Sequence, residues 1–354
     1  MPLILVVNPG STSTKVAVFR GRRPVFESVL DHDPRSLGRC GGIIDQAAYR
    51  KRALLRELKK HNMDISGMDL FAARGGLLRP LSSGVYRVNS GMLDDLRGCR
   101  YGEHASNLGA IMAWDLAAGR TRNVFIADPV VVDELSPEAR LSGLPDLPRR
   151  SIFHALNQKA VARLVALKLG RRYESCRLIV AHVGGGISIG VHKGGRVVDV
   201  NNALEAEGPF TCERSGGVPA IALLQKLCDE RVNSCEAKRL LLRRGGLLAH
   251  LGTNDCRTIE QRVRSGDRRS RLVFGAFVYQ MAKAIGAAAA ALSGRVDAVA
   301  LTGNVMQCRW VRNRLSRMVR FVAPVHVVAG SIEMKALANS ALDVHEGLRK
   351  AARY

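Results

Sequence analysis

The chain has 354 residues, of which 47% are hydrophobic, and 54 Lys and Arg against 31 Asp and Glu give a formal net charge of +23. This length favours two domains, and the hydrophobic content is enough for a core in each, which excludes a largely disordered chain. The N-terminus lacks the basic stretch and cleavage site of a signal peptide. The longest apolar helical run, near residues 285–292, is too short to span a membrane. We therefore expect a cytoplasmic protein with no membrane partner.

The eight cysteines are scattered along the chain, and no two of them form a C-x-x-C pair. This spacing argues against zinc ribbons and disulfide frameworks. Reduced thiols in a cytosolic protein are therefore expected.

A net charge of +23 would attract polyanions non-specifically. Basic residues are spread through predicted helices such as 50–60, with further pairs at 243–244 and 268–269. Aromatic residues make up only 5% and do not alternate with the cations, as they would on a base-stacking surface. We interpret the charge as an Arg-rich solvated surface and expect no dedicated nucleic-acid partner. A polyanion-binding protein with salt-sensitive binding to DNA or RNA is the alternative.

The predicted elements of the first half form a strand meander followed by alternating helices and strands. In chain order they are strands at 3–7, 15–19 and 24–30, a helix over 45–61, a strand at 69–73, a helix over 105–119 and a strand at 123–127. A Pro-rich segment at 144–148 follows, and we expect it to separate two domains.

The second half is predicted to repeat this plan. Its elements are a helix over 151–169, strands at 178–183, 188–192 and 196–201, helices between 219 and 294, strands at 296–301 and 325–328, and a last helix over 333–350. A meander followed by helix–strand alternation in both halves implies two mixed α/β domains.

Three turns dense in Gly, Ser, Thr or Asn follow predicted strands, at residues 8–15, 184–188 and 302–304. Gly allows backbone N–H groups to approach an anion closely, and hydroxyls add donors. The first two turns lead into strands rather than helices, so neither matches a P-loop or a Rossmann fingerprint. The alternative is a pair of tight β-turns whose glycines serve only positive φ. Two such loops in similar settings favour a nucleotide held between related halves.

Residues 8–15 (NPGSTSTK) resemble the first phosphate loop of butyrate kinases, which belong to the acetokinase family in the superfamily of acetate and sugar kinases, heat-shock chaperones and actin. Further stretches are similar to the same enzymes and occur in the family order from residue 3 to about 340. They are 101–110 (YGEHASNLGA), 128–135 (DPVVVDEL), 151–160 (SIFHALNQKA), 207–210 (EGPF), 213–216 (ERSG) and 251–255 (LGTND).

The resemblance implies two similar mixed-sheet α/β domains of the actin-like ATPase (ribonuclease H-like) type, with a nucleotide cleft between them. The N-terminal domain would be 1–148, with the helix within 333–354 packing back on it, and the C-terminal domain 149–332. The implied activity is reversible, ATP-dependent phosphorylation of a short-chain carboxylate to an acyl phosphate by direct in-line transfer. ATP or ADP and Mg²⁺ are the implied cofactors, and a dimer or larger homo-oligomer is the implied assembly.

Such a reaction needs positioning and cations rather than a general base, because a carboxylate is already ionised at pH 7. The residues that match the family's catalytic positions are Arg74, His104, His154 and Arg214. Those expected to bind the nucleotide are Asn8, Ser11, Ser13 and Lys15 in the first loop, Gly184, Gly185 and Gly186 in the second, and Thr302 and Gly303 near the adenosine. Asp128 resembles the magnesium-associated aspartate of the family, with Asn8 beside the metal.

Three positions depart from the family pattern. Asn304 follows Thr302-Gly303 where a second Gly is usual, Ala73 stands where Gly usually precedes Arg74, and the loop 330–334 lacks two acidic residues. A catalytically weakened nucleotide-binding homologue is therefore one alternative. The motifs favour butyrate or a branched relative over acetate, and an acetate- or propionate-preferring kinase is the other alternative. One methylene in an acyl pocket is worth only ~1–3 kcal/mol.

Overall fold

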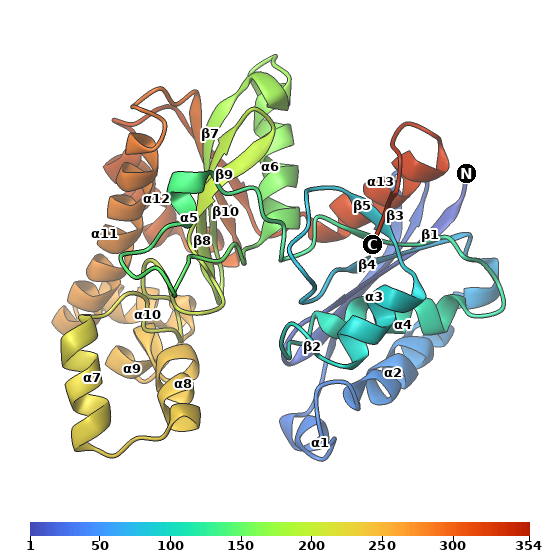
Figure 1. The fold of residues 1–354 in the computed structure, drawn as a ribbon, viewed down its shortest axis with the longest axis horizontal. Coiled ribbons are helices and arrows are strands. Elements are labelled where there is room, and N and C mark those ends of the chain that lie inside the picture. Colours follow the sequence, from blue (N-terminus) through green and yellow to red (C-terminus); the bar gives the residue numbers. More distant parts are fainter. The chain divides into compact units, whose positions relative to one another are not determined.

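The computed structural model describes residues 1–354, and the chain divides into two compact units (Figure 1). Unit 1 comprises Met1–Asp133 and Ile332–Tyr354, and unit 2 comprises Glu134–Ser331. Each unit holds one mixed sheet with helices packed against it, so the expected α/β fold class is confirmed.

Unit 1 contains seven strands and five α-helices. The strands are β1 (Leu3–Pro9), β2 (Ser13–Arg20), β3 (Arg23–Asp31), β4 (Leu70–Arg74), β5 (Val85–Arg87), β6 (Val124–Ala127) and β12 (Ala352–Arg353). The helices are α1 (Pro34–Gly38), α2 (Gln46–Lys60), α3 (Ser90–Arg97), α4 (Asn107–Ala117) and α13 (Glu333–His345). The strand order is β12-β5-β6-β4-β1-β2-β3, and both α4 and α13 pack across β1, β4 and β6.

Unit 2 contains five strands and eight α-helices. The strands are β7 (Arg177–Val183), β8 (Ile187–Lys193), β9 (Arg196–Val200), β10 (Ala298–Gly303) and β11 (Val325–Ala329). The helices are α5 (Pro137–Arg140), α6 (Ala155–Lys168), α7 (Ala220–Asp229), α8 (Ser234–Arg243), α9 (Gly246–Leu251), α10 (Cys256–Arg264), α11 (Arg268–Ala290) and α12 (Arg309–Val319). The strand order is β11-β10-β7-β8-β9.

The two sheets share one plan. In unit 1, β1, β2 and β3 form an antiparallel meander, β4 lies parallel to β1, and β6 lies parallel to β4. In unit 2, β7, β8 and β9 form the same meander, β10 lies parallel to β7, and β11 lies parallel to β10. Parallel strands end at the same edge of a sheet, where ligands bind in open α/β folds. The loops after β1, β4 and β6, and those after β7, β10 and β11, therefore gather the residues of interest within each unit.

The division between the units lies after Asp133 and not at the Pro-rich segment 144–148 that the sequence suggested. The reason is that the intervening residues bind to unit 2. Glu134 forms a buried ion pair with Lys159, with Oε2 and Nζ 2.8 Å apart, and the N–H of Ser136 donates to the carbonyl of Val198 at 2.8 Å. The Pro-rich segment 144–148 is therefore an irregular segment inside unit 2 and not the start of that unit.

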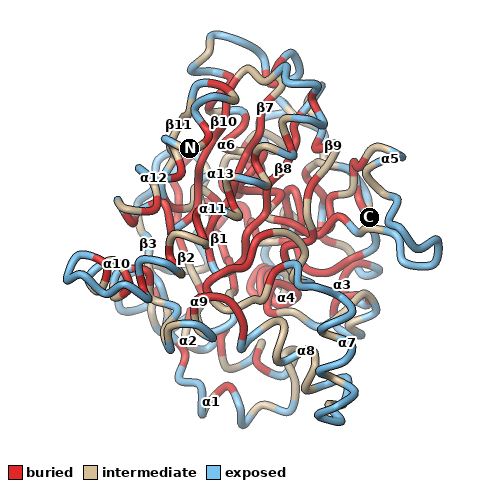
Figure 2. The backbone as a smooth tube through the Cα atoms, turned by 90° about the vertical axis from the view of Figure 1, so that its left-hand side faces the viewer, coloured by how far each residue is buried: buried red, intermediate tan, exposed pale blue.

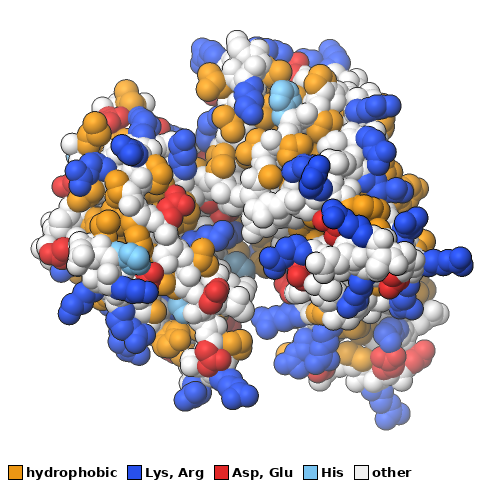
Figure 3. All heavy atoms as spheres, turned by 180° about the vertical axis from the view of Figure 1, so that it is seen from behind, with side chains coloured by type: hydrophobic (Ala, Val, Ile, Leu, Met, Phe, Trp, Pro, Cys, Tyr) orange, Lys and Arg blue, Asp and Glu red, His pale blue; other side chains and the backbone are white.

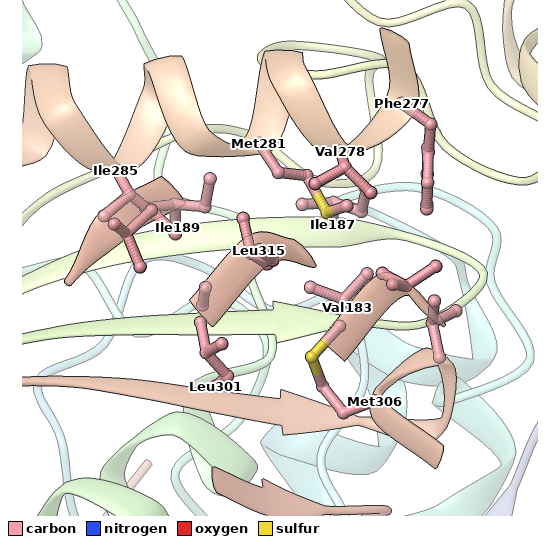
Figure 4. Close-up of a cluster of buried hydrophobic side chains, with 14 of the residues drawn as sticks. Val183, Ile187, Ile189, Phe277, Val278, Met281, Ile285, Leu301, Met306 and Leu315 are labelled. Atoms are coloured by element: carbon pink, nitrogen blue, oxygen red, sulfur yellow. The ribbon is translucent and has the colours of Figure 1, made fainter. Parts of the chain in front are cut away.

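Helix α11 is the core helix of unit 2. Residues from β7, β8 and α11 interdigitate in one apolar cluster, in which Val183, Ile187 and Met281 are at most 1% exposed (Figure 4). Figure 2 shows the same strands buried along most of their length. The helix has 23 residues and is long and apolar enough to cross a membrane by length and composition, which the shorter run at 285–292 did not reveal. Its apolar face, however, packs against the sheet of unit 2.

Candidate functional site

The first loop connects β1 to β2 as a tight turn. The N–H of Gly10 donates to the carbonyl of Ser13 at 2.7 Å, and Pro9 pairs with Thr14 across the hairpin. The N–H groups of Ser11 and Thr12, at its tip, make no hydrogen bond within the protein. Gly10 does not have φ in the left-handed region, so positive φ is not the reason for Gly at this position. The two unused N–H groups are suited to an anion.

Arg50, on α2, holds this loop from inside the unit. Its side chain is 0% exposed, and Nη1 donates to the carbonyls of Gly10 at 2.8 Å and Ser13 at 3.0 Å, while Nη2 donates to that of Ser11 at 2.9 Å. Gln46 Oε1 accepts two further bonds from the same guanidinium. No carboxylate pairs with it, and burial lowers the pKa of Arg50. The prediction that residues 50–60 carry only solvated cations is therefore wrong at Arg50.

Elsewhere the basic surface is as diffuse as the sequence suggested. Figure 3 shows Lys and Arg side chains spread over the visible face of each unit, interspersed with apolar and acidic ones. Arg52, two residues from Arg50 on α2, is exposed.

His32 continues the buried polar contacts behind the first loop. One of its ring nitrogens, Nε2, lies 2.8 Å from Thr14 Oγ1, which also accepts from Arg50 at 3.2 Å. Burial, and secondarily the charge of Arg50, lower the pKa of His32 to about 4. The neutral ring can accept the Thr14 hydroxyl hydrogen at Nε2, for which the structure offers no other acceptor.

Asn8 and Lys15 face each other across the β1–β2 hairpin, so their side chains share one face of the sheet. Asn8 is 4% exposed, and its Nδ2 donates to Glu333 Oε2 at 2.8 Å. The side-chain ammonium of Lys15 makes no hydrogen bond or ion pair with another residue. Glu333, the first residue of α13, is itself buried and is the acidic group that the loop 330–334 retains. We had not singled it out from the sequence.

Arg74 ends β4, and its half-buried guanidinium makes no hydrogen bond or ion pair with another residue. The two residues after Arg74 are glycines because a larger side chain would overlap neighbouring atoms. A Cβ on Gly75 would lie 2.5 Å from Cβ of Pro129, and one on Gly76 would lie 2.5 Å from Oδ1 of Asn107. Ala73, by contrast, is fully buried in β4 opposite Val7 of β1, where a methyl group fits.

Asp128 and His104 complete the predicted residues of unit 1. Asp128 follows β6, is 2% exposed and has φ of 38°, a left-handed conformation that is uncommon for Asp. Its Oδ1 accepts from Ser83 Oγ at 2.5 Å and from the N–H of Gly84 at 2.9 Å. His104 Nδ1 lies 2.8 Å from Ser106 Oγ and accepts from the N–H of Ser106 at 3.2 Å, so Nε2 carries the ring hydrogen when His104 is neutral.

The second loop, Gly184 to Gly186, connects β7 to β8. None of its glycines has φ in the left-handed region, so the interpretation that they serve only positive φ is wrong. A Cβ on Gly186 would overlap Nη1 of Arg214, whereas one on Gly185 would meet nothing within 4 Å. Gly186 therefore leaves space for a side chain of the protein, and Gly185 leaves the loop surface open.

His154 and Arg214 lie together beside Gly186. A Cβ on Gly186 would also come within 3.3 Å of Cε1 of His154. Nη1 of Arg214 donates to the carbonyl of Ala203 at 2.5 Å, and burial lowers the pKa of Arg214. His154 stacks on His182, with ring centroids 3.9 Å apart and planes inclined by 11°. The structure thus brings three of the predicted residues of unit 2 into contact distance.

The third loop, after β10, begins at a buried threonine that bonds within unit 2. Thr302 is 0% exposed, and its hydroxyl donates to the carbonyl of Gly330 at 3.1 Å while accepting from Asn157 Nδ2 at 3.2 Å. The side chain of Thr302 therefore bonds inside unit 2. The left-handed residue is Gly303, with φ of 97°, and Asn304 has ordinary backbone geometry and an exposed side chain.

A family model described as the acetokinase family matches residues 108–323, which is more than half of the chain. The chain belongs to the acetokinase family. The family expected from the motifs is thus confirmed, while the narrower resemblance to butyrate kinases stays a prediction.

Solved structures of acetokinase-like enzymes share the fold over nearly the whole chain. The acetate kinase of Porphyromonas gingivalis matches with a TM-score of 0.79 at 20% identity, covering 98% of this chain and 100% of that one. A propionate kinase from Francisella tularensis matches with 0.77 at 17% identity, over 96% and 99%. The acetate kinase of Entamoeba histolytica gives 0.74 at 16%, over 95% and 97%. The fold of this acetokinase-family chain is therefore that of these kinases.

Proposed function

We propose that this protein transfers the γ-phosphoryl group of ATP to a short-chain carboxylate, reversibly, and forms an acyl phosphate and ADP. Membership of the acetokinase family supports the reaction class. The observation that carries the proposal for this chain is the guanidinium of Arg74. It ends a parallel strand, is half-buried and has no acidic partner within the protein, as a receptor for a carboxylate should.

The proposed reaction requires little proton transfer by protein side chains. A carboxylate oxygen forms a bond to the γ-phosphorus while the bond from that phosphorus to the β–γ bridging oxygen breaks, and ADP departs. The carboxylate is ionised at neutral pH, so no general base is required. What remains is to bring two anions together and to stabilise the equatorial oxygens of the moving group.

In this proposal Arg74 orients the carboxylate, and the first loop holds phosphate oxygens through Ser11, Ser13 and the N–H groups at its tip. Lys15 adds a cation without an internal partner. In unit 2, the second loop exposes its backbone at Gly185, and Arg214 beside it supplies positive charge.

In this proposal two histidines act as hydrogen-bond donors and not as bases. His154 donates to the moving phosphoryl group, and His104 is a second donor of the same type. Gly303 brings backbone, without a side chain, to the position proposed for adenosine.

Three side chains of unit 1 have the chemistry that Mg²⁺ prefers. Asp128 and Glu333 are buried carboxylates, and Asn8 adds an amide oxygen, because its Nδ2 is used on Glu333. Mg²⁺ prefers oxygen ligands and usually takes one or two protein carboxylates, completing its shell with water and substrate phosphates. When bound, the ion neutralises charge on the transferring phosphates. We propose Asp128 and Asn8, together with Glu333, as its protein ligands.

For the substrate we propose butyrate or a branched relative, on the strength of the motifs. An acetate- or propionate-preferring kinase is the main alternative, since the solved structures reported above carry those two names. We also propose a cytoplasmic homo-oligomer.

The test is a coupled assay of Mg²⁺-dependent ADP formation across C2–C6 acids, with the acyl phosphate trapped as a hydroxamate. We expect the highest kcat/KM with a C4 or branched acid. Arg214→Ala should lose at least a hundredfold, because it removes a partly buried charge at the proposed reaction site. ATP binding measured by calorimetry without turnover of any acid would instead identify a weakened nucleotide-binding homologue.

A further inference from the structure

A row of buried polar side chains runs away from His154 into unit 2. It passes from His154, which precedes α6, and Gln158 on α6 to Ser188 and His192 on β8 and then to Tyr173. Four of its five members are buried, and Gln158, Ser188 and His192 are 0% exposed. Buried polar groups are costly unless every donor and acceptor is used, so the direction of each bond can be worked out.

The amide of Gln158 fixes the middle of the row. Its Nε2 lies 3.0 Å from the carbonyl oxygen of Ser188, which only accepts, so this end of the amide must be the NH₂ group. The second hydrogen of Nε2 goes to Ser188 Oγ at 2.7 Å. The amide oxygen therefore faces His192, whose Nε2 lies 3.0 Å away and must carry a hydrogen.

His192 gives the inner end of the row. Burial, and secondarily the charges of Lys159 and Arg163, hold the pKa of His192 well below its ordinary value, so the ring is neutral. With its hydrogen on Nε2, Nδ1 accepts the hydroxyl hydrogen of Tyr173 at 2.8 Å.

Ser188 gives the outer end. Its hydroxyl oxygen accepts from Gln158 Nε2 at 2.7 Å and from the backbone N–H of His154 at 3.5 Å, so both lone pairs are used. The hydroxyl hydrogen is then donated to Nδ1 of His154, 2.9 Å away. Nδ1 of His154 then has no hydrogen, and a neutral His154 carries its hydrogen on Nε2.

We infer that Tyr173, His192, Gln158 and Ser188 are positioning residues that hold His154 in the Nε2–H form, with each group donating to the next toward His154. The inference rests on the proposed function, because it gives His154 its donor at the atom that would meet the phosphoryl group. A donor fixed before the reaction needs no reorganisation during it. We name this row the tautomer chain.

One glycine makes room for the tautomer chain. Ser188, Gly190 and His192 alternate along β8 and so face the same side. A Cβ on Gly190 would overlap Oε1 of Gln158 and lie 3.2 Å from Nε2 of His192. Gly190→Ala therefore displaces the amide without removing any hydrogen-bonding group.

The direct test is nitrogen NMR on protein labelled with [¹⁵N]histidine, with the His154 signals identified by their loss in His154→Gln. In the wild type we expect Nε2 of His154 to be protonated and Nδ1 to be unprotonated. Ser188→Ala and Gly190→Ala should each give a mixture of the two tautomers, whereas Ser188→Thr, which keeps the hydroxyl, should retain the single form. A wild-type His154 protonated on Nδ1, or no change in Ser188→Ala, would overturn the inference.

Kinetics provide the second readout. We expect kcat to fall about tenfold to a hundredfold in Ser188→Ala, by analogy with the loss of partners that orient metal-binding histidines. KM for ATP should be unchanged, and Ser188→Thr should recover kcat. Ser270→Ala is the matched control, since Ser270 is 1% exposed in unit 2 and its hydroxyl has no hydrogen-bond partner. A similar loss in Ser270→Ala would point to general destabilisation and contradict the inference.

The two proposals fail separately. The NMR experiment needs no substrate, so the expected tautomer in a protein that turns over no acid would refute the proposed function alone. Turnover by a protein whose His154 carries its hydrogen on Nδ1 would refute the tautomer chain alone.

Discussion

The first and second loops occupy equivalent places in the two sheets and are supported by opposite chemistry. Behind the first loop lies one buried cation, Arg50, which binds three loop carbonyls directly. Behind the second lie His154, His182 and the neutral groups of the tautomer chain, and the nearest cation, Arg214, lies beside the loop. The same backbone plan therefore does not dictate how a loop is held.

The difference has a physical consequence for each loop. In unit 1, drawing the carbonyl oxygens inward to Arg50 fixes the turn and leaves the N–H groups of Ser11 and Thr12 for an anion. In unit 2 the supporting groups include His154, the proposed donor to the phosphoryl group, whose tautomer depends on the residues behind it. The first support acts on backbone shape, and the second acts on a side chain.

Arg50→Met should have the largest effect on stability. It removes hydrogen bonds to three carbonyls and to Gln46, and bonds that involve a charged group are worth more than neutral ones. We expect the free energy of unfolding of unit 1 to fall by about 3 kcal/mol, measured by urea denaturation. Arg50→Lys should recover part of the loss, because an ammonium group cannot reach all of these acceptors.

Arg52→Met is the matched control for Arg50, since Arg52 is exposed on the same helix. We expect a change within about 0.5 kcal/mol, as for surface substitutions generally. An equal loss of stability in the two variants would show that α2, and not the contact with the first loop, explains the effect.

Gly186→Ala should be the most damaging substitution in the second loop. The added methyl group would overlap Arg214 and approach the carbonyl of Ala203, so the guanidinium has to move. We expect kcat to fall about a hundredfold if Arg214 acts in the proposed way, because displacement of a catalytic group by an ångström has an effect of this size. Gly185→Ala, where a Cβ meets nothing, should fold normally and change mainly KM for ATP; equal effects on kcat would contradict this distinction.

His32 permits a pH test of the first loop. The pKa of His32 is lowered to about 4 in the folded protein, against about 6.5 when unfolded, so the unfolded state binds more protons between these values. Stability should therefore fall as pH decreases through this window, by about 2 kcal/mol between pH 7 and pH 5. His32→Gln should lose roughly that much less over the same range, measured by urea denaturation. An identical pH dependence in both proteins would exclude His32 as the source.

Strands, hairpins and the repeated plan could be predicted because their signals are local. Alternating apolar residues bounded by turns at 21–23 and 193–195 gave the strands of both meanders to within a few residues. Helix α3 and strand β5 escaped prediction, since each is short and its apolar residues find their partners only in the folded unit.

The supports of the loops depend on tertiary structure to different degrees. Arg50 stands in a run of basic residues that looks solvated, and only the packing of α2 shows that this one side chain points inward. The sequence does contain a pattern that indicates the tautomer chain. Ser188, Gly190 and His192 alternate with the apolar residues of β8. Polar residues repeated on one face of a buried strand need partners, and a functional network is one way to supply them.

Asn304→Gly should have the smallest effect, although Asn304 stands in the third loop where a second Gly is usual in the family. The left-handed conformation falls on Gly303, and a Cβ there would overlap the carbonyl of Val183. Asn304 begins a short 3₁₀ helix with its side chain exposed, so it needs no special backbone geometry. We expect KM for ATP to change less than about threefold in Asn304→Gly, in line with surface substitutions. Gly303→Ala is the contrasting variant and should impair folding or ATP binding. A tenfold or larger gain in ATP affinity in Asn304→Gly would mean that the Asn304 side chain obstructs the nucleotide, and the third loop would then limit ATP binding more than either of the first two loops.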